Sequence, residues 1–354
     1  MLTKNHNYML KALELAQKRR GFCAPNPSVG AVIVKEGQII GEGSHFGCGH
    51  PHAEVEALKK AGAGAQSADI YITLEPCQHT GRTPPCIEAL IKAGIQSVFY
   101  GMDDPNPLMA GKSRIRLADA GISCALLPMS EITDFYDSYR YWWRTKRPRV
   151  TAKLAMSLDG KIANPCGEPL TLTGAAAKQR TFEERQKADA LLTTMRTIAN
   201  DDPQFNVRLD GETIAKPLYV LDSRLEMKPS AKVFQTCASV TLLHGPAVDP
   251  TKLELFLRQG VHCHELSAEK NRLNLEEALQ ILGKEHHDVW LEAGGQCFSA
   301  FLSADLIDRA LIYIAPQIVG QGLPGFVGDF SSTGQAKWSA LGDDMLCELI
   351  MTKP

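Results

Sequence analysis

Along the first hundred positions, segments with hydrophobic residues at helical spacing alternate with short apolar segments typical of strands. Apolar side chains recur at helical spacing over residues 7–19, where they include Met9 and Leu13. The tripeptide Lys35-Glu36-Gly37 contains a glycine that can adopt a positive φ, so it predicts the turn of a hairpin. The predicted strands are residues 28–34, 38–42, 69–74 and 97–100, and the further helices are residues 52–61 and 85–93. This alternation predicts an α/β fold.

The pattern breaks at residues 141–149, where a proline lies within a basic cluster (YWWRTKRPR). Such a segment is typical of a connector, so we expect two domains, residues 1–146 and 147–354. Beyond the break, a helix is predicted at 275–282, and strands are predicted at residues 150–156, 190–194, 218–222, 240–244, 289–292 and 310–314. The second domain is therefore also predicted to be α/β.

Composition narrows the class of protein. A chain of 354 residues fits two domains, and 44% hydrophobic with 22% charged residues is ordinary for a soluble globular protein. The formal charge of −2 opposes binding to nucleic acid or anionic membranes, and favours small-molecule partners. Residues 1–16 lack a signal sequence, and no apolar run reaches the length of a membrane span. Ten scattered cysteines are unlike a disulfide framework, so we expect a cytoplasmic protein.

The strongest chemical motif is His52-Ala53-Glu54 followed by Pro76-Cys77 and Cys86. One imidazole and two thiolates are a common ligand set for a catalytic zinc ion, whose fourth position stays open for water. A carboxylate near that water can transfer its proton to a departing amine, a role that suits Glu54. This combination is the signature of zinc deaminases that act on nucleobases. We therefore expect one zinc ion per chain, with His52 and Glu54 in the first turn of a helix and Cys86 just after Pro85, at the start of another.

Other residues near the motif leave alternatives open. His45, Cys48, His50 and His79 could serve as ligands, but none has the surrounding motif. The cysteines at 124, 237, 263, 297 and 347 are interpreted as core residues. A purely structural zinc ion would normally have four protein ligands.

Longer runs surround the motif: Pro25-Asn26-Pro27-Ser28-Val29-Gly30, Pro51-His52-Ala53-Glu54, TLEPCQHTGRTPPC at residues 73–86, and Asp104-Pro105-Asn106-Pro107. Eight residues separate Cys77 from Cys86, where most nucleoside and tRNA deaminases have two. In these runs the chain resembles, almost from end to end, the bifunctional diaminohydroxyphosphoribosylaminopyrimidine deaminase and aminophosphoribosylaminouracil reductase family of riboflavin biosynthesis. The resemblance implies a cytidine-deaminase-like three-layer αβα domain followed by a dihydrofolate-reductase-like α/β domain.

That resemblance also implies a reaction sequence. Deamination of 2,5-diamino-6-(5-phosphoribosylamino)pyrimidin-4(3H)-one would be followed by NADPH-dependent reduction of its ribosyl group to ribityl. In the first domain the resemblance places Asn26 near the pyrimidine, and His79, Arg82 and Thr83 near the phosphoribosyl group. Arginine and hydroxyl donors suit a phosphate.

In the second half the resemblance rests on KLAMSLDGK at residues 153–161, Asn200-Asp201-Asp202-Pro203, Asp222-Ser223 and Glu292-Ala293-Gly294-Gly295. It implies a set of substrate contacts, namely Lys153, Arg185, Phe205, Arg208 and Glu292. It implies a set of NADPH contacts, namely Ala155, Thr171, Thr197, Asp201, Ser223, Gly294 and Gly295. A dimer or tetramer of this chain is expected.

The chain departs from the family pattern at one place in the reductase half. The family has Gly-Glu-Ser and, two residues later, tryptophan, whereas this chain has Gly167-Glu168-Pro169 and Thr171. An alternative is therefore a deaminase whose C-terminal half only binds nucleotide or supports assembly. Two further alternatives are a nucleic-acid or nucleoside deaminase with an unrelated C-terminal module and a zinc-binding interaction protein.

Overall fold

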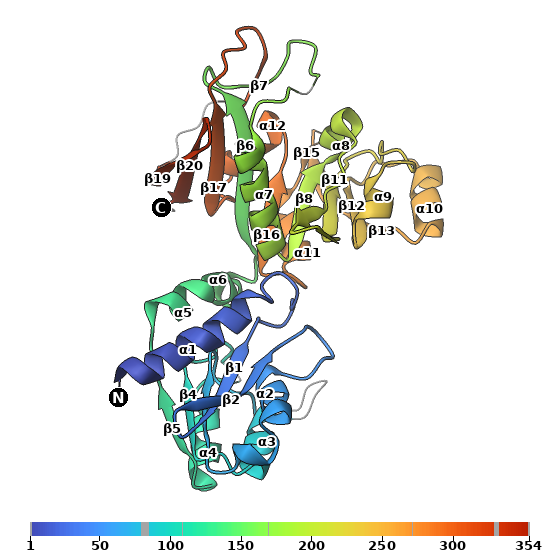
Figure 1. The fold of residues 1–354 in the computed structure, drawn as a ribbon. Coiled ribbons are helices and arrows are strands. Elements are labelled where there is room, and N and C mark those ends of the chain that lie inside the picture. Colours follow the sequence, from blue (N-terminus) through green and yellow to red (C-terminus); the bar gives the residue numbers. More distant parts are fainter. Residues whose placement is uncertain are drawn as a thin grey trace. The chain divides into compact units, whose positions relative to one another are not determined.

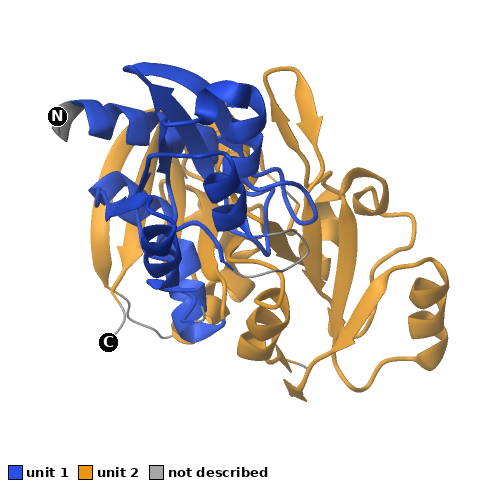
Figure 2. Ribbon diagram, turned by 90° about the horizontal axis from the view of Figure 1, so that it is seen from below, with its two compact units in different colours: residues 1–146 blue, residues 147–354 orange. Residues whose placement is uncertain are grey.

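Figure 1 shows the computed structural model, which describes residues 2–78, 85–107, 109–168, 170–270, 272–328 and 333–352. Contacts within the chain divide it into unit 1, Met1–Lys146, and unit 2, Arg147–Pro354 (Figure 2). None of the helices in the described ranges is both long and apolar enough to cross a membrane.

Unit 1 is built on a five-stranded sheet in the order β2-β1-β3-β4-β5. β1 pairs antiparallel with both β2 and β3, while β3, β4 and β5 are parallel. The strands are β1 (Gly30–Lys35), β2 (Gln38–Ser44), β3 (Asp69–Ile72), β4 (Ser97–Tyr100) and β5 (Ser123–Leu126). Glu36 and Gly37 both have positive φ, 51° and 80°, and form the two-residue turn between β1 and β2. The predicted hairpin is confirmed.

Helices cover both faces of this sheet. They are α1 (Leu2–Gln17), α2 (Ala53–Ala61), α3 (Cys86–Lys92), α4 (Lys112–Asp119), α5 (Ser130–Phe135) and α6 (Asp137–Thr145), with a 3-10 turn at Gly62–Ala65. Alternate residues of β1 point to opposite faces. Val32 and Val34 pack in the core with α1, α5 and α6, whereas Ala31 and Ile33 pack in the core with α2, α3 and α4. Unit 1 is therefore a three-layer αβα structure.

The segment 141–149 was predicted to be a connector, and this is wrong for most of its length. Tyr141–Thr145 continue α6, because Trp142 and Trp143 pack against the core on the α1 side of the sheet. Lys146 ends the helix with a φ of 57°, and the next strand begins at Arg149. The connection between the units is only residues 146–148.

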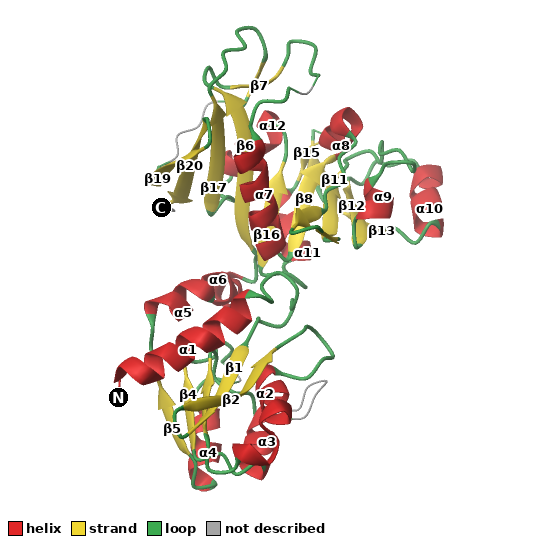
Figure 3. Cartoon of the chain, viewed as in Figure 1, coloured by secondary structure: helices red, strands yellow, loops and turns green. Residues whose placement is uncertain are grey.

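Unit 2 contains a nine-stranded sheet in the order β13-β12-β11-β8-β16-β6-β17-β20-β19 (Figure 3). The pairs from β13 to β17 are parallel, whereas β20 pairs antiparallel with β17 and β19. These strands are β6 (Arg149–Ser157), β8 (Ala190–Thr194), β11 (Pro217–Leu221), β12 (Ser239–His244), β13 (His262–Glu265), β16 (Asp288–Glu292), β17 (Arg309–Ala315), β19 (Gly334–Leu341) and β20 (Asp344–Met351). All six strands predicted for this half are present.

Two hydrophobic cores fill the two faces of the large sheet. On one face α11 and α12 pack against Leu154, Leu192 and Leu291; on the other α7, α8, α9 and α10 pack against residues such as Leu191 and Trp290. The helices are α7 (Ala175–Lys187), α8 (Met195–Asp201), α9 (Val233–Thr236), α10 (Pro250–Arg258), α11 (Leu275–Leu282) and α12 (Gly295–Ser303). Short strand pairs lie outside this sheet: β7 (Lys161–Ala163) with β18 (Leu323–Pro324), β9 (Val207–Leu209) with β10 (Glu212–Ile214), and β14 (Ala268–Glu269) with β15 (Arg272–Leu273).

We predict that Gly43→Ala destabilises unit 1 and disturbs α2. A Cβ atom at Gly43 would overlap the carbonyl oxygen of Ala53 and lie 2.5 Å from the backbone nitrogen of Ala57. Relief of this overpacking should lower the free energy of unfolding by about 1–3 kcal/mol. Gly64→Ala is the control, because its Cβ would meet only the flexible end of Ile40 at 3.2 Å. Thermal unfolding of the two variants checks this, and equal unfolding temperatures would contradict it.

Candidate functional site

Three side chains from separate segments of unit 1 converge on one point. His52 is the residue that precedes α2, Cys86 is the first residue of α3, and Cys77 lies in the segment after β3. His52 Nδ1 lies 3.0 Å from Cys86 Sγ and 3.5 Å from Cys77 Sγ, and the two sulfur atoms are 3.3 Å apart. Among the described residues these three form the group of His, Cys, Asp and Glu side chains that could hold a metal ion. The predicted placement at two helix starts is confirmed.

The spacing of these atoms suits a zinc ion. Ligands at usual zinc distances in a tetrahedron lie about 3.5–3.8 Å apart, and the observed separations of 3.0–3.5 Å are within a few tenths of an ångström of that. Hydrogen bonds from Cys86 and His52 lower the pKa of Cys77 to about 4. The hydrogen bond to Cys77 and burial raise the pKa of Cys86, so the protein alone favours one thiolate. A divalent cation would stabilise both thiolates.

Glu54 is the second residue of α2 and is 3% exposed. Burial raises the pKa of its carboxyl group, an effect that the negative charge of Cys77 reinforces. A raised pKa makes this carboxyl group a better proton acceptor than an ordinary glutamate. Glu54 follows His52 by two residues, as in the motif. The three-residue group of possible metal ligands does not include it.

Asn26 is connected to the metal-ligand segment through His45. Asn26 Nδ2 lies 3.0 Å from His45 Nε2, and His45 Nδ1 lies 3.1 Å from the carbonyl oxygen of Pro51, which precedes His52. Because a carbonyl only accepts, Nδ1 donates to Pro51, and Nε2 is free to accept from the Asn26 amide. His45 thus uses both ring nitrogens within the protein, although its ring lies 5.1 Å from that of His52. Neither His45 nor Cys48 nor His50 belongs to the three-residue group.

Glu75 is a buried residue of the motif for which the sequence suggested no role. Its carboxylate accepts hydrogen bonds from the backbone nitrogens of Asp104, Gly111 and Ser113 at 3.0–3.3 Å, and from the Ser113 hydroxyl. Glu75 therefore joins the Cys77 segment to the loop before α4. In the sequence, the position of this acidic residue two places before the predicted ligand Cys77 could have indicated a role near the site. The predicted phosphate contacts His79, Arg82 and Thr83 lie outside the described residues.

In unit 2 many of the predicted residues lie at or after the carboxyl ends of three neighbouring parallel strands, β11, β8 and β16. These are Thr197 and Asp201 in the helix after β8, Ser223 after β11, and Glu292, Gly294 and Gly295 at the end of β16. On the next strand, β6, Lys153 pairs with Glu292, and Ala155 follows it by two residues. Ligands of open α/β sheets bind at this edge. Gly294 immediately precedes α12, and an added Cβ there would meet nothing within 4 Å.

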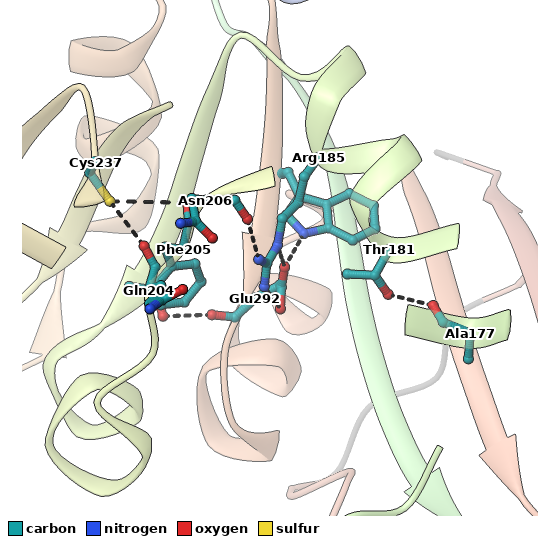
Figure 4. A network of polar contacts seen from close by, with 10 residues as sticks. Ala177, Thr181, Arg185, Gln204, Phe205, Asn206, Cys237 and Glu292 are labelled. Atoms are coloured by element: carbon teal, nitrogen blue, oxygen red, sulfur yellow. Dashed lines mark hydrogen bonds and ion pairs between the residues drawn. The ribbon is translucent and has the colours of Figure 1, made fainter. Parts of the chain in front are cut away.

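An ion pair whose side chains are only 12% and 13% exposed, that of Arg185 and Glu292, lies at this edge (Figure 4). Arg185 on α7 binds Glu292 through Nε and, at 2.9 Å, through Nη2, while its Nη1 donates to the carbonyl oxygen of Asn206 at 3.0 Å. The indole nitrogen of Trp290 also donates to Glu292. Burial opposes the charge of Glu292, but the guanidinium outweighs it and lowers the pKa of this carboxyl group to about 2. Arg185 therefore holds Glu292 as a carboxylate.

The remaining predicted residues of unit 2 differ in accessibility. The ring of Phe205 is 3% exposed, lies 5.3 Å from the Arg185 guanidinium, and has a backbone φ of 46°. Arg208 is exposed, with its guanidinium 5.2 Å from the ring of Phe182. Thr171 is exposed, and its carbonyl oxygen accepts a hydrogen bond from Gln317 at 3.4 Å. Lys153, in contrast, is partly buried, and burial lowers its pKa, with Glu292 opposing the shift.

Comparisons with known proteins match both halves of the chain. Residues 2–102 match the cytidine and deoxycytidylate deaminase zinc-binding region, and residues 148–347 match the RibD C-terminal domain. The riboflavin biosynthesis protein RibD of Haemophilus influenzae is 40% identical over 332 residues, which cover 90% of this chain and 87% of that protein. RibD of Escherichia coli is 39% identical, with 90% and 89% covered.

Solved structures agree over the whole length. Acinetobacter baumannii RibD has a TM-score of 0.86 at 38% identity, with 100% of both chains covered. A diaminohydroxyphosphoribosylaminopyrimidine deaminase/5-amino-6-(5-phosphoribosylamino)uracil reductase from Thermotoga maritima has a TM-score of 0.84 at 29% identity, with 99% of both chains covered. The predicted fold class, a cytidine-deaminase-like domain followed by a second α/β domain, is confirmed. The chain therefore belongs to the RibD family of riboflavin biosynthesis proteins.

Proposed function

We propose that unit 1 is the hydrolytic deaminase and unit 2 the NADPH-dependent reductase of riboflavin biosynthesis in this chain. The substrate is 2,5-diamino-6-(5-phosphoribosylamino)pyrimidin-4(3H)-one, which is first deaminated and then reduced at its ribosyl group. The observation that carries the proposal is the group of His52, Cys77 and Cys86, together with the buried carboxyl group of Glu54, two residues after His52.

In the deaminase, His52 Nδ1 and the sulfur atoms of Cys77 and Cys86 would hold zinc. When bound, zinc at such a site lowers the pKa of a water molecule and so supplies the nucleophile. Glu54 takes up a proton at its carboxyl group and releases it to the departing amino group, for which its raised pKa is suited. We assign Asn26 to the pyrimidine, because its amide is oriented by His45. His79, Arg82 and Thr83 remain our candidates for the phosphoribosyl group.

In the reductase, NADPH supplies the hydride, and the protein positions cofactor and substrate. We assign Ala155, Thr171, Thr197, Asp201, Ser223, Gly294 and Gly295 to the cofactor, and Lys153, Arg208 and Glu292 to the substrate. The carboxyl edge of the sheet supports this assignment, since it gathers most of these residues. Arg185 and Phe205 remain our candidates for further substrate contacts; Arg185 also binds Glu292, and its guanidinium lies 5.3 Å from the ring of Phe205.

We further propose that the enzyme works in the cytoplasm on this small molecule rather than on nucleic acid. None of the ten cysteines, all of which lie in the described ranges, forms a disulfide bond, which suits a reducing compartment. A dimer or tetramer stays a prediction. The edge strand β19, on which Trp338 is 56% exposed, is where we expect a second copy to pair.

One experiment tests both halves of this function. The phosphoribosyl diaminopyrimidinone is supplied to the full chain with and without NADPH, and the products are identified by mass. We expect replacement of an amino group by oxygen in both samples, and the gain of two hydrogens only with NADPH. Deamination alone, with NADPH present, would restrict the function to that of a deaminase with a non-reducing C-terminal unit.

Glu54→Gln should abolish deamination while the chain keeps about one zinc ion. The substitution removes the proton carrier but leaves the three ligand atoms in place. Cys86→Ala is the matched variant, and it should lose the metal because a three-ligand site tolerates no missing ligand. Zinc content by plasma mass spectrometry and turnover of the substrate check both. Near-normal turnover of Glu54→Gln would rule out its role.

Gly294→Ala and Gly295→Ala should separate cofactor binding from folding. A Cβ at Gly294 meets open space, so this variant should fold normally and bind NADPH more weakly, because the methyl group occupies the cofactor's approach. A Cβ at Gly295 would overlap the carbonyl oxygen of Pro324 and lie 2.8 Å from that of Gly325, so this variant should lose stability. Calorimetric NADPH titration and thermal unfolding distinguish the two, and unchanged NADPH affinity of Gly294→Ala would contradict the site.

Arg185→Met should destabilise unit 2 by about 3–5 kcal/mol at neutral pH, because it leaves a buried carboxylate without its partner. In the wild type, the depressed pKa of Glu292 contributes stability above pH 4.5 that is lost as pH falls towards about 2. The variant should lack this acid-dependent loss. Urea unfolding at neutral pH and below pH 4 measures the difference. Addition of Glu292→Gln should recover part of the stability, and identical acid sensitivity of wild type and Arg185→Met would disprove the pairing.

A further inference from the structure

The hydroxyl group of Tyr136 joins two segments of unit 1 that are far apart in the sequence. Tyr136 lies between α5 and α6 and is 2% exposed. Its oxygen lies 2.8 Å from the carbonyl oxygen of Ser28, in the loop between α1 and β1. The same oxygen lies 2.6 Å from Thr73 Oγ1, directly after β3. One phenolic oxygen thus contacts both segments.

The direction of each hydrogen bond follows from the chemistry of the groups. The carbonyl oxygen of Ser28 can only accept, so the Tyr136 hydroxyl donates to it. Thr73 must then donate its own hydroxyl proton to Tyr136. Thr73 Oγ1 accepts in turn from the backbone nitrogen of Gly30 at 3.1 Å. The chain of bonds therefore runs in one direction, from Gly30 through Thr73 and Tyr136 to Ser28, and each of its donors is used.

Both segments joined by this hydroxyl carry residues of the deaminase site. Ser28 follows Asn26 by two positions, and Thr73 precedes Cys77 by four. We propose, resting on the deaminase function above, that Tyr136 is a positioning residue whose hydroxyl fixes the separation of Asn26 from the zinc ligand Cys77. Its hydroxyl acts through the hydrogen bonds to Ser28 and Thr73.

A second tie supports the same role for this helical segment. The hydroxyl of Tyr139 on α6 donates to Asp104 Oδ1 at 3.4 Å, and the backbone nitrogen of Asp104 donates to Glu75. The match to the deaminase zinc-binding region ends at residue 102. The segment from α5 to α6 thus supports the site from outside the matched region.

Tyr136→Phe in the full chain tests the proposal, because it keeps the buried ring and removes only the hydroxyl. We expect about one zinc ion per chain and kcat/KM for deamination lower by about tenfold or more, since small displacements of catalytic groups have effects of this size. NADPH oxidation on separately prepared deaminated substrate should stay at the wild-type rate. Tyr71→Phe is the control, because Tyr71 is also 2% exposed but its hydroxyl donates to Asn5, at 2.9 Å.

Thr73 supplies a second, independent measurement. Thr73→Ser keeps a hydroxyl and should keep deamination, whereas Thr73→Val removes it and should lose activity as Tyr136→Phe does. The double variant Tyr136→Phe/Thr73→Val should deaminate no more slowly than the less active of the two single variants, because both substitutions break the same chain of hydrogen bonds. If Tyr136→Phe fails to fold, the comparison of deamination by Thr73→Ser and Thr73→Val tests the proposal instead. Wild-type-like deamination by Thr73→Val, or equal effects of Tyr136→Phe and Tyr71→Phe, would overturn the proposal. A wild type without deamination would instead refute the function itself.

Discussion

The candidate site of unit 1 depends on one constraint, that three ligand atoms from three chain segments meet within a few ångströms. His52 and Cys86 meet because α2 and α3 begin at the same end of the sheet, and Cys77 meets them because it follows the central strand β3. Close packing of α2 makes this possible, since Gly43 leaves no side chain between β2 and the start of that helix. The carboxylate of Glu75 then secures the loop on the far side of Cys77.

In unit 2 the main constraint is the placement of charged side chains, largely removed from solvent, at the carboxyl edge of the sheet. Arg185 satisfies both oxygens of Glu292 and uses its remaining nitrogen on the backbone of the Asn206 segment. A charged residue placed so deeply would be costly without this partner. Because Glu292 stays ionised, the nearby Lys153 has a fixed negative neighbour that opposes the effect of its own burial. Arg185, Glu292 and Lys153 thus form one connected charged group at the carboxyl edge of the sheet.

Local patterns in the sequence predicted most of this architecture. The spacing of apolar residues and the glycine at position 37 predicted β1, β2 and β4. The helix starts near His52 and Cys86 followed from the His-x-Glu motif and from Pro85. Helix α6 was missed because aromatic and basic residues around Trp142 look like a connector until the core that receives them is known. The role of Glu75, and the support of Glu292 by Arg185, depend on contacts between segments about 30 and 107 positions apart. Such contacts leave no periodic signal.

The connection of residues 146–148 has a consequence for metabolism rather than for structure. Since one continuous chain carries both units, every translation event delivers a deaminase and a reductase together, in a fixed one-to-one ratio. Gene expression cannot adjust the supply of one activity against the other. Any imbalance in flux between the two steps, and with it the steady-state level of the deaminated intermediate, is therefore set by the kinetic constants of the two centres and by the concentrations of their substrates, not by the ratio of the two enzymes.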